Sequence, residues 1–314
     1  MNKRQWLGFL CLQLLLVSIL LSCSRTDTGT KNLRAGTYLQ FTDALGNSVT
    51  LAAKPKRVIS AFGSYCEAWL EAGGEIIGVT NDVISQRDFS IDRNTAIIGT
   101  VKHPSIEAII ALEPDFVLLS ADIPSHLVLS DILTQSGIAH AFFKVEHFED
   151  FLSMLNILTD ITGRKDLYRK NGLEVQEQIQ SLLAKRTYRV QKPTVLLVRC
   201  SALSVKALAS DTMINVMLTE LGADNLVSRR PSLLSDLGME AILEENPDFI
   251  LAIAMGDSDQ ANQAMKEYFA SNPAWKDLKA VQQAHYLFLP KELFQYKPNA
   301  RWSESYAYLE NIIF

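Results

Sequence analysis

The apolar residues of the chain fall into two alternating patterns. Short continuous apolar runs, such as Phe116–Ser120 and Phe249–Ala254, are separated by segments in which apolar residues recur every three or four positions. Short continuous runs are typical of parallel strands covered on both faces, whereas the spaced pattern is typical of amphipathic helices. The alternation of the two predicts an α/β fold.

The alternation runs through two stretches of the chain. The first opens with a hairpin, Tyr38–Thr42 and Ser48–Leu51, whose turn contains Gly46 and Asn47. Its further strands are expected at Arg57–Ser60, Ile76–Val79, Ile97–Gly99, Phe116–Ser120 and Ala139–Val145, and its helices at Tyr65–Ala72, Ser105–Leu112 and Pro124–Gln135. The second begins after Pro193 and alternates through Thr194–Val198, Thr212–Leu221, Met239–Glu244, Phe249–Ala254, Gln260–Phe269, Tyr286–Leu289 and Ser303–Ile313.

A long amphipathic helix is expected between the two stretches, over residues 164–186. Its apolar side recurs at helical spacing, with Tyr168, Val175, Ile179 and Leu182. Such a helix is roughly 30 Å long, about the width of a small domain. A helix over His147–Thr162 leads into it, and Gly172 costs it on the order of 1 kcal/mol relative to Ala. We therefore expect two Rossmann-like α/β lobes joined by a single long backbone helix.

Two segments far apart in the chain share one pattern. In Ser105–Leu118 and Gly238–Leu251, the residues Glu, Ala, Ile, Pro, Asp and Phe recur at identical offsets. Each copy predicts a short helix, a Pro-Asp turn and a buried strand. With one copy in each lobe, the two halves of the chain are expected to be built alike.

The N-terminus has the features of a secretory signal. Lys3 and Arg4 precede an apolar run that closes on Leu20-Leu21-Ser22-Cys23. This ending resembles a bacterial lipobox, which implies that Cys23 is lipidated; the alternative is an uncleaved anchor helix. Both interpretations tether the protein to a membrane outside the cytoplasm.

The chain thus divides into five expected segments. They are a lipoprotein signal peptide over 1–23, a flexible tether over 24–37, an N-terminal α/β lobe over 38–146, connecting helices including the backbone helix over 147–187, and a C-terminal α/β lobe over 188–314.

Composition narrows the class of protein. With 314 residues of which 48% are hydrophobic, the chain can bury a large core, and its net charge of −5 comes from interspersed signs, so no nucleic-acid partner is expected. Cys66 and Cys200 remain beyond the signal, and we favour two buried free thiols over a disulfide.

Motifs for catalysis or metal binding are not found in the sequence. It contains no Gly-rich phosphate loop, no nucleophile elbow and no zinc-protease motif, so we do not expect an enzyme. The five histidines fall in unrelated loops and element ends without metal-ligand spacing, and we expect neither a bare metal site nor a bound cofactor.

Polar and aromatic residues gather just beyond the ends of the predicted strands, where open α/β sheets bind ligands. Facing loops of this kind would form a cleft for a large anionic or chelate ligand, with guanidinium groups for carboxylates and aromatic rings for planar faces. The candidate ligand-binding residues are Ser64, Tyr65, Asp82, Lys102, His103, Arg199, Arg301 and Trp302.

The two copies of the repeat each carry a glutamate at the same position, Glu107 and Glu240. Each is a favourable charge near a helix N-terminus and needs no partner for that role. A matched acidic residue on two similar lobes also forms a two-point docking site for a symmetric cationic partner.

These features together resemble a known family. The lipobox, Lys56–Ser60, Glu67–Val79, the two Glu…Pro-Asp copies, the long helix and Asn272–Val281 occur in the order found in the helical-backbone class of substrate-binding proteins of ABC importers. That class includes receptors for ferric siderophores, haem and cobalamin, and the resemblance covers about residues 38–314.

The resemblance implies a surface-tethered, monomeric receptor that captures an iron chelate, a ferric siderophore or haem, between its lobes and delivers it to a membrane permease dimer. It also implies that Glu107 and Glu240 dock on permease arginines, and that the protein is exported and lipid-anchored, periplasmic or on the outer face of the cytoplasmic membrane. Cobalamin is the alternative ligand of the same class. A Zn or Mn receptor, a chelatase- or nitrogenase-like enzyme and a non-transport surface lipoprotein are further alternatives.

Overall fold

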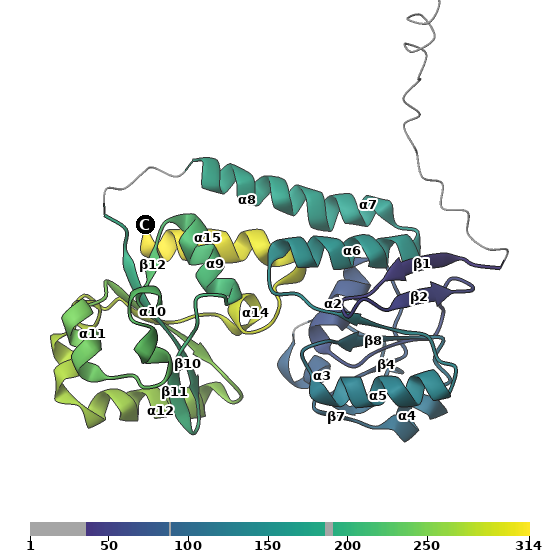
Figure 1. Ribbon diagram of the computed structural model, residues 1–314, viewed down its shortest axis with the longest axis horizontal. Helices are drawn as coiled ribbons and strands as arrows, with labels where there is room; N and C mark the ends of the chain where they lie inside the picture. The colour runs from purple at the N-terminus through teal and green to yellow at the C-terminus, as the bar shows by residue number, and fades with distance from the viewer. Residues whose placement is uncertain (1–35, 88, 186–190) are drawn as a thin grey trace, which may run out of the picture. The chain divides into compact units, whose positions relative to one another are not determined.

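The computed structural model describes residues 36–314 apart from residues 88 and 186–190 (Figure 1). The predicted signal peptide, Cys23 and most of the tether therefore lie outside the described residues. Within the described part of the chain, no helix is both long and apolar enough to cross a membrane.

The first sheet has five strands in the order β5-β4-β3-β8-β9, and all neighbouring strands run parallel. They are β3 (Val58–Ser60), β4 (Gly78–Val79), β5 (Ala96–Ile97), β8 (Phe116–Ser120) and β9 (His140–Phe143). Two hairpins flank this sheet: β1 (Leu39–Thr42) with β2 (Ser48–Leu51), and β6 (Gly99–Thr100) with β7 (His103–Pro104). The helices of this lobe are α2 (Gly63–Glu71), α3 (Asp82–Gln86), α4 (Ile106–Ala111) and α5 (Pro124–Gln135).

The second sheet has the order β11-β10-β13-β14, with β12 also paired to β10. Its strands are β10 (Thr194–Ser201), β11 (Ser204–Ala207), β12 (Asp224–Asn225), β13 (Phe249–Ala254) and β14 (Tyr286–Phe288), all parallel to their neighbours except β11. The helices of this lobe are α9 (Met213–Leu221), α10 (Leu226–Arg229), α11 (Met239–Glu245), α12 (Ser258–Ser271), α13 (Lys279–Gln282), α14 (Lys291–Phe294) and α15 (Trp302–Ile313). This is the α/β class that the sequence predicts.

A run of helices connects the two sheets (Figure 1). Helix α6 (Phe148–Thr162) is followed by α7 (Lys165–Tyr168), a π-helical turn over Arg169–Leu173 and α8 (Glu174–Ala184). The last three form the predicted backbone helix, whose final residue lies outside the described part. Gly172 lies in the π turn, and a Cβ there would lie 3.0 Å from Leu152 and 3.2 Å from Leu155 of helix α6. The glycine permits close packing of the two helices.

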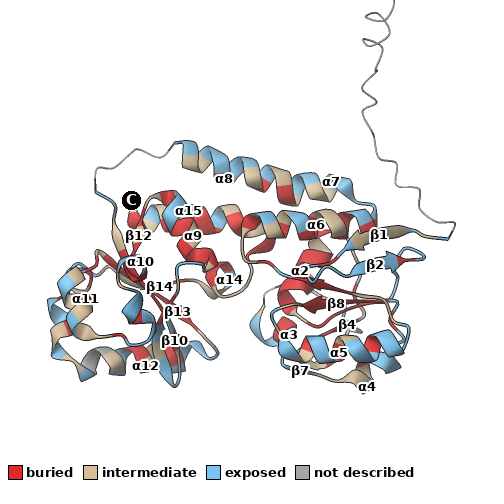
Figure 2. Cartoon of the chain, viewed as in Figure 1, coloured by how far each residue is buried: buried red, intermediate tan, exposed pale blue. Residues whose placement is uncertain are grey.

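Both sheets share one apolar core on the side of these helices. Alternate residues of the first sheet, such as Phe116 and Leu118, lie in the same buried cluster as Leu197 and Leu251 of the second. Helices α6, α8, α9 and α15 supply the side chains between them, and Figure 2 shows the buried positions along this layer. The opposite faces of the two sheets pack in separate clusters, one with α4 and α5 and one with α10 to α13.

The repeat of the sequence is also a repeat of the structure. Glu113 and Asn246, at the same offset in the two copies, both adopt a positive φ, of 44° and 45°. Two residues later, the carboxylate of Asp115 accepts hydrogen bonds from the backbone N–H groups of Lys56 and Arg57, at 2.7 and 2.8 Å. Asp248 accepts in the same way from the backbone N–H of Thr194, at 2.8 Å. In each lobe the Pro-Asp turn therefore fixes the start of the neighbouring strand.

Most of the expected elements are present, and the differences lie in short ones. The strand Phe116–Ser120 and helix Pro124–Gln135 have the predicted bounds, whereas α3, β11, α10, α13 and α14 were not expected. Cys66 and Cys200 are free and buried, as favoured, and burial raises the pKa of each thiol to about 12. The division of the lobes at residues 146 and 187 stays a prediction.

The close approach at Gly172 gives a test of the helix layer. Gly172→Leu is expected to lower the free energy of unfolding by about 1–3 kcal/mol, because the added side chain must displace Leu152 and Leu155. The control is Lys170→Leu, which places the same side chain on the exposed face of the helix and should change stability by less than about 0.5 kcal/mol. Equal losses in chemical denaturation would contradict the packing described here.

Candidate functional site

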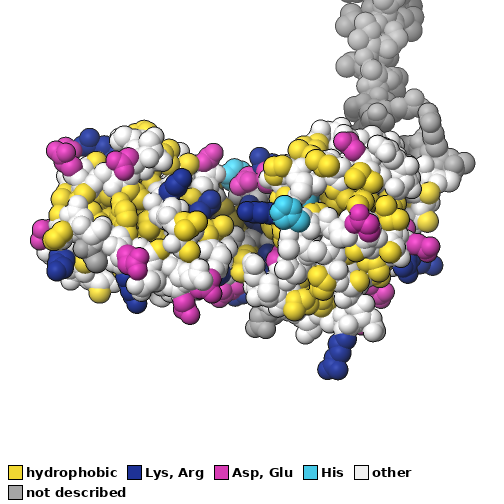
Figure 3. Space-filling view, turned by 90° about the horizontal axis from the view of Figure 1, so that it is seen from below, with side chains coloured by type: hydrophobic (Ala, Val, Ile, Leu, Met, Phe, Trp, Pro, Cys, Tyr) yellow, Lys and Arg dark blue, Asp and Glu magenta, His cyan; other side chains and the backbone are white. Residues whose placement is uncertain are grey.

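A cleft of about 1100 Å³ is lined by residues from both lobes. The first lobe contributes Glu67, Ile84, Ser85, Gln86, Arg87 and Phe89, and the second contributes Gly256, Asp257, Ser258, Asp259, Lys291, Glu292, Tyr296 and Arg301. Figure 3 shows the surface hollowed between the two lobes, with basic and acidic side chains around the hollow. Sites for small organic ligands are commonly roughly 300–1,000 Å³, so this cleft can hold a large chelate.

The cleft lies at the carboxyl ends of parallel strands in both sheets. The residues 84–87 follow strand β4, Gly256–Asp259 follow β13, and Lys291 follows β14. In open α/β sheets, ligands bind in the crevice outside the carboxyl ends of the strands, where the loops to the following helices lie. The position is the one expected from the sequence, although the lining residues differ.

Arg87 is the most buried cation of the cleft, with 5% of its side chain exposed. Its guanidinium donates to Glu67 at 2.9 Å and to the hydroxyl of Ser64 at 2.6 Å, and it lies 4.6 Å from the ring centre of Tyr296. Burial lowers the pKa of Arg87, while Glu67 and Asp82 favour its charged form. The group thus joins helix α2 of one lobe to the C-terminal segment of the other.

Asp82 lies beside Arg87 and binds the N-terminus of helix α2. One carboxylate oxygen accepts from the backbone N–H of Gly63, at the first residue of helix α2, and the other accepts from the hydroxyl of Thr80 at 2.6 Å. A Cβ on Gly63 would lie 2.4 Å from Asp82 and 2.6 Å from Arg87. Glycine at this position therefore lets both charged groups approach the helix N-terminus.

The segment after α14 returns to the first lobe and binds one face of helix α2. The side chain of Asn299 donates to the carbonyl of Ser64 at 2.9 Å and to Glu67 at 3.0 Å. The backbone N–H of Ala300 donates to the Glu71 carboxylate at 3.2 Å. Burial, followed by the neighbouring charge of Glu67, raises the pKa of Glu71 to about 8, so this carboxyl is largely protonated at neutral pH.

Acidic groups outnumber cations on the cleft wall. Besides Glu67, the carboxylates are Asp257, Asp259 and Glu292, and the cations are Arg87, Lys291 and Arg301. Arg301 is paired with Glu304 at 2.8 Å, and Lys291 donates to the carbonyl of Gly256. The guanidinium groups expected from the sequence for ligand carboxylates are therefore present but already paired.

Lys102 and His103 lie exposed on the β6–β7 hairpin and do not line this cleft. The hairpin is held by His126, which is buried: its Nδ1 accepts from the backbone N–H of Ser120 at 3.0 Å, and its Nε2 lies 3.0 Å from the carbonyl of Val101. Burial lowers the pKa of His126 to about 4. The neutral ring is a structural link between strand β8 and the hairpin.

Of the other candidate residues, Arg301 lines the cleft, while Ser64 and Asp82 lie buried behind Arg87. Tyr65 and Trp302 are each 1% exposed and belong to the core. The hydroxyl of Tyr65 donates to the carbonyl of Phe143, and Trp302 packs edge-on against Phe148. Both rings are part of the buried apolar cluster that the two sheets share.

Arg199 lies within strand β10, which continues past its predicted end to form a hairpin with β11. There Arg199 pairs across the ladder with Lys206, and its side chain is exposed. It is not among the residues that line the cleft. The prediction that it follows a strand end was wrong, because the strand runs on to Ser201.

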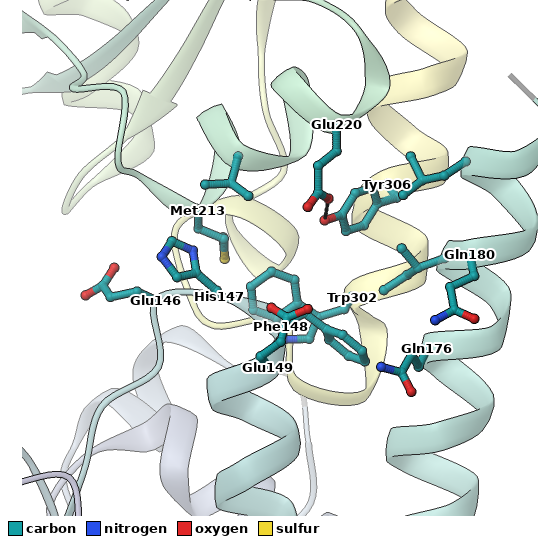
Figure 4. A pocket seen from close by; sticks show the side chains of 13 residues that line it. Glu146, His147, Phe148, Glu149, Gln176, Gln180, Met213, Glu220, Trp302 and Tyr306 are labelled. Carbon is teal, nitrogen blue, oxygen red and sulfur yellow. Dashed lines mark hydrogen bonds between the residues drawn. The ribbon is translucent and has the colours of Figure 1, made fainter. Parts of the chain in front are cut away.

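A second, smaller cavity of about 120 Å³ lies among the connecting helices. Figure 4 shows His147 and Met213 facing one another on one side of it, and the hydrogen bond from Tyr306 to Glu220 on another. Trp302 and Phe148 also line it. It is too small for a siderophore or haem by the volumes that such sites require.

Several cleft residues were not identified from the sequence: Glu67, Arg87, Asp257, Asp259, Lys291, Glu292 and Tyr296. The strand-end rule would have found Asp257 and Lys291, since each follows a predicted strand closely. Arg87 follows the short helix α3, which has no periodic signal. Among the described residues, no group of three or more His, Cys, Asp or Glu side chains could hold a metal ion.

Glu107 and Glu240 are both exposed and lie in the first turn of their helices, α4 and α11. The hydroxyl of Ser105 donates to Glu107 at 3.0 Å, and hydrogen bonds from this backbone and from Ser105 lower the pKa of the Glu107 carboxyl. Both side chains are accessible to a partner. Their docking role stays a prediction.

Two α/β lobes with a cleft at their strand ends define a solute-binding receptor. The chain belongs to the periplasmic binding protein family, whose model matches residues 58–293. The family consists of transport receptors, so the expectation of a receptor rather than an enzyme is confirmed, as is the predicted resemblance to the substrate-binding proteins of ABC importers.

Individual relatives are distant. The chain is 23% identical, over 87% of each chain, to the putative ABC transporter substrate-binding lipoprotein YhfQ of Bacillus subtilis. It is 22% identical to the high-affinity heme uptake protein IsdE of Staphylococcus aureus, over 60% of this chain and 64% of that one.

Solved structures show the same fold. The structure of S. aureus IsdE complexed with heme aligns with a TM-score of 0.68 at 18% identity, over 82% of this chain and 98% of that one. S. aureus SirA complexed with staphyloferrin B aligns with a TM-score of 0.64 at 18% identity, over 87% and 96%.

The buried carboxyl of Glu71 predicts a pH dependence. The folded chain keeps a proton on Glu71 that the unfolded chain releases above about pH 4.5. The free energy of unfolding therefore falls as pH rises from about 4.5 to about 8. Glu71→Gln keeps an acceptor for Ala300 without ionising. At pH 8 we expect the variant to be more stable than the wild type by about 1–3 kcal/mol.

The measurement is urea unfolding at pH 5, 6.5 and 8, with Glu75→Gln as the control at an exposed glutamate nearby. A Glu71→Gln variant whose stability falls with pH as steeply as the wild type would contradict this assignment.

The buried His126 predicts that stability depends on pH with the opposite sign. Below about pH 6.5 the unfolded chain binds a proton on this residue that the folded chain takes up only near pH 4, so stability falls as pH falls through this range. In wild type we expect the free energy of unfolding to fall by on the order of 2–3 kcal/mol between pH 7 and pH 4 because of this residue, and His126→Asn should remove that fall. At pH 7 the variant should be less stable than the wild type by about 1 kcal/mol, because it loses the hydrogen bond to Val101. Thermal unfolding between pH 4 and 7 measures the slope. The exposed His103→Asn is the control, and equal slopes in wild type and His126→Asn would refute the prediction.

Proposed function

We propose that the protein is the receptor of an ABC importer and that it captures an iron chelate in the cleft between its lobes. The observation that carries the proposal is the cleft of about 1100 Å³ at the strand ends of both sheets, in a member of the periplasmic binding protein family. The relatives support the ligand class, since IsdE is named for heme uptake and SirA was solved with staphyloferrin B.

A ferric siderophore fits the cleft better than haem. Among the described lining residues there is no His, Met or Cys, which are common axial ligands of haem iron, and the Tyr296 ring is covered by Arg87. A siderophore brings a complete set of iron ligands and needs only shape, hydrogen bonds and charge from the protein. Cobalamin, which also arrives as a complete chelate, is the alternative ligand.

Delivery requires a membrane partner. Glu107 and Glu240 are exposed at matched positions of the two repeated modules, so they support docking on cationic residues of a permease dimer by a monomeric receptor. The lipobox-like Leu20–Cys23 supports export and lipid anchoring at Cys23, and the name of YhfQ, a lipoprotein, is consistent with this.

The proposal is tested by isothermal titration calorimetry of the full-length chain with ferric siderophores, haem, cobalamin and Zn²⁺. We expect saturable binding of an iron chelate. Ser85→Trp, at an exposed position of the cleft wall, should weaken it at least tenfold by filling the space that the ligand requires.

The control is Ser136→Trp, an equally exposed serine at the far end of helix α5. Unchanged affinity in Ser85→Trp would place the ligand elsewhere. Binding restricted to Zn²⁺, or to no member of the panel, would contradict the proposed function.

A further inference from the structure

Both arginines of the cleft are already paired with carboxylates of the protein, while Lys291 donates to the carbonyl of Gly256 and forms no ion pair with another described residue. Arg87 is held by Glu67 and Ser64, and its face lies on Tyr296. Both Nε and Nη2 of Arg301 donate to one oxygen of Glu304, at 3.0 and 2.8 Å. An anionic ligand would have to compete with these carboxylates for the guanidinium groups.

The carboxylates of the second lobe are in the opposite situation. Asp259 and Glu292 form no hydrogen bond or ion pair with another described residue, and Asp257 accepts only from the backbone N–H of Gln260, at 2.9 Å. All three are exposed, and all three line the same cleft. Unpaired charges on a ligand wall attract the opposite sign and repel their own.

Displacing the internal pairs carries a cost. Glu67 is largely buried beside Arg87, and a ligand anion that took over this guanidinium would leave the Glu67 carboxylate without its cation. Asp257 and Asp259 have no such partner to lose, and Glu292 acts on Arg301 only through its nearby charge, which raises the pKa of that guanidinium. A cationic group on a ligand therefore gains interactions with the exposed carboxylates of the second lobe, whereas an anionic group finds Lys291 without an ion pair among the described residues and must otherwise break existing pairs.

From this distribution, and on the basis of the proposed function, we infer that the cleft selects ferric chelates that are uncharged or positively charged over anionic ones. Chelates of the tris-hydroxamate type meet this condition, because three hydroxamates neutralise Fe³⁺. The exposed carboxylates of Asp257, Asp259 and Glu292 on the cleft wall attract a pendant ammonium on such a chelate, while Ile84 and Phe89 offer apolar surface for its carbon chain. Tris-catecholate chelates and haem propionates carry the disfavoured charge.

Two probes that differ in the charge of one pendant group test this selection. Ferrioxamine B carries a protonated pendant amine, and its N-acetylated form is the same ferric tris-hydroxamate without that charge. We expect the full-length chain to bind ferrioxamine B about five- to tenfold more tightly than the acetylated form, with a preference that shrinks as salt is raised. Ferric enterobactin, a strongly anionic tris-catecholate, should bind at least tenfold more weakly than either.

Substitutions of the cleft carboxylates test whether they cause the preference for the chelate with the pendant amine. Asp259→Asn with Glu292→Gln should reduce the preference for the amine to about twofold. Glu267→Gln is the control, because this exposed glutamate of helix α12 lies outside the cleft lining and should leave the preference unchanged.

The outcomes separate the inference from the proposed function. Tighter binding of ferric enterobactin, or equal binding of the two hydroxamate forms, would overturn the charge selection while the receptor function stands. Binding of cobalamin or Zn²⁺ with no ferric chelate bound would overturn both. A preference for the amine that persists in the double variant would also refute the assignment to Asp259 and Glu292.

Discussion

One apolar core that both sheets share holds this structure together. Each sheet turns one face toward the layer of helices α6, α8, α9 and α15, and a single buried cluster runs from Phe116 through Ile179 to Leu251. Interiors packed in this way resist small displacements, because every shift opens voids. The separation of the two lobes is therefore set by the helix layer, and so is the width of the cleft between their strand ends. Gly172 contributes by allowing helix α6 and the backbone helix to pack closely.

A polar layer lies between that core and the cleft. Ser64, Glu67 and Glu71 occupy one face of helix α2 and receive hydrogen bonds from Arg87, Asn299 and Ala300. Because Ser64, Glu67 and Glu71 each receive at least one of these hydrogen bonds, the cleft wall is fixed before a ligand arrives. A preformed site of this kind loses less conformational entropy on binding. The receptor thus meets a rigid chelate with a rigid surface, and the groups left free to interact with it are mainly the carboxylates of the second lobe.

The sequence was sufficient for the architecture because the fold depends on repeated patterns. The apolar run Phe249–Ala254 and the helix Pro124–Gln135 have strong periodic signals, and the matched Glu…Pro-Asp modules revealed that the lobes are alike. The site was harder to predict. Arg87 follows a five-residue helix without a periodic pattern, and Tyr296 reaches the cleft through a return segment that sequence spacing does not encode. Trp302 was assigned to the ligand because aromatic residues serve both cores and clefts, and its burial depends on tertiary contacts.

The position of the iron in a complex shows whether the chelate binds in the cleft. Crystals of the chain grown with a ferric tris-hydroxamate should give an anomalous difference map at the iron edge. We expect a single strong peak in the cleft between Arg87, Tyr296 and Asp259, with the lobes placed as they are here. A peak outside this cleft, for example beside Lys102 and His103, would contradict it, as would a bound state in which the helix layer has repacked to bring the lobes together.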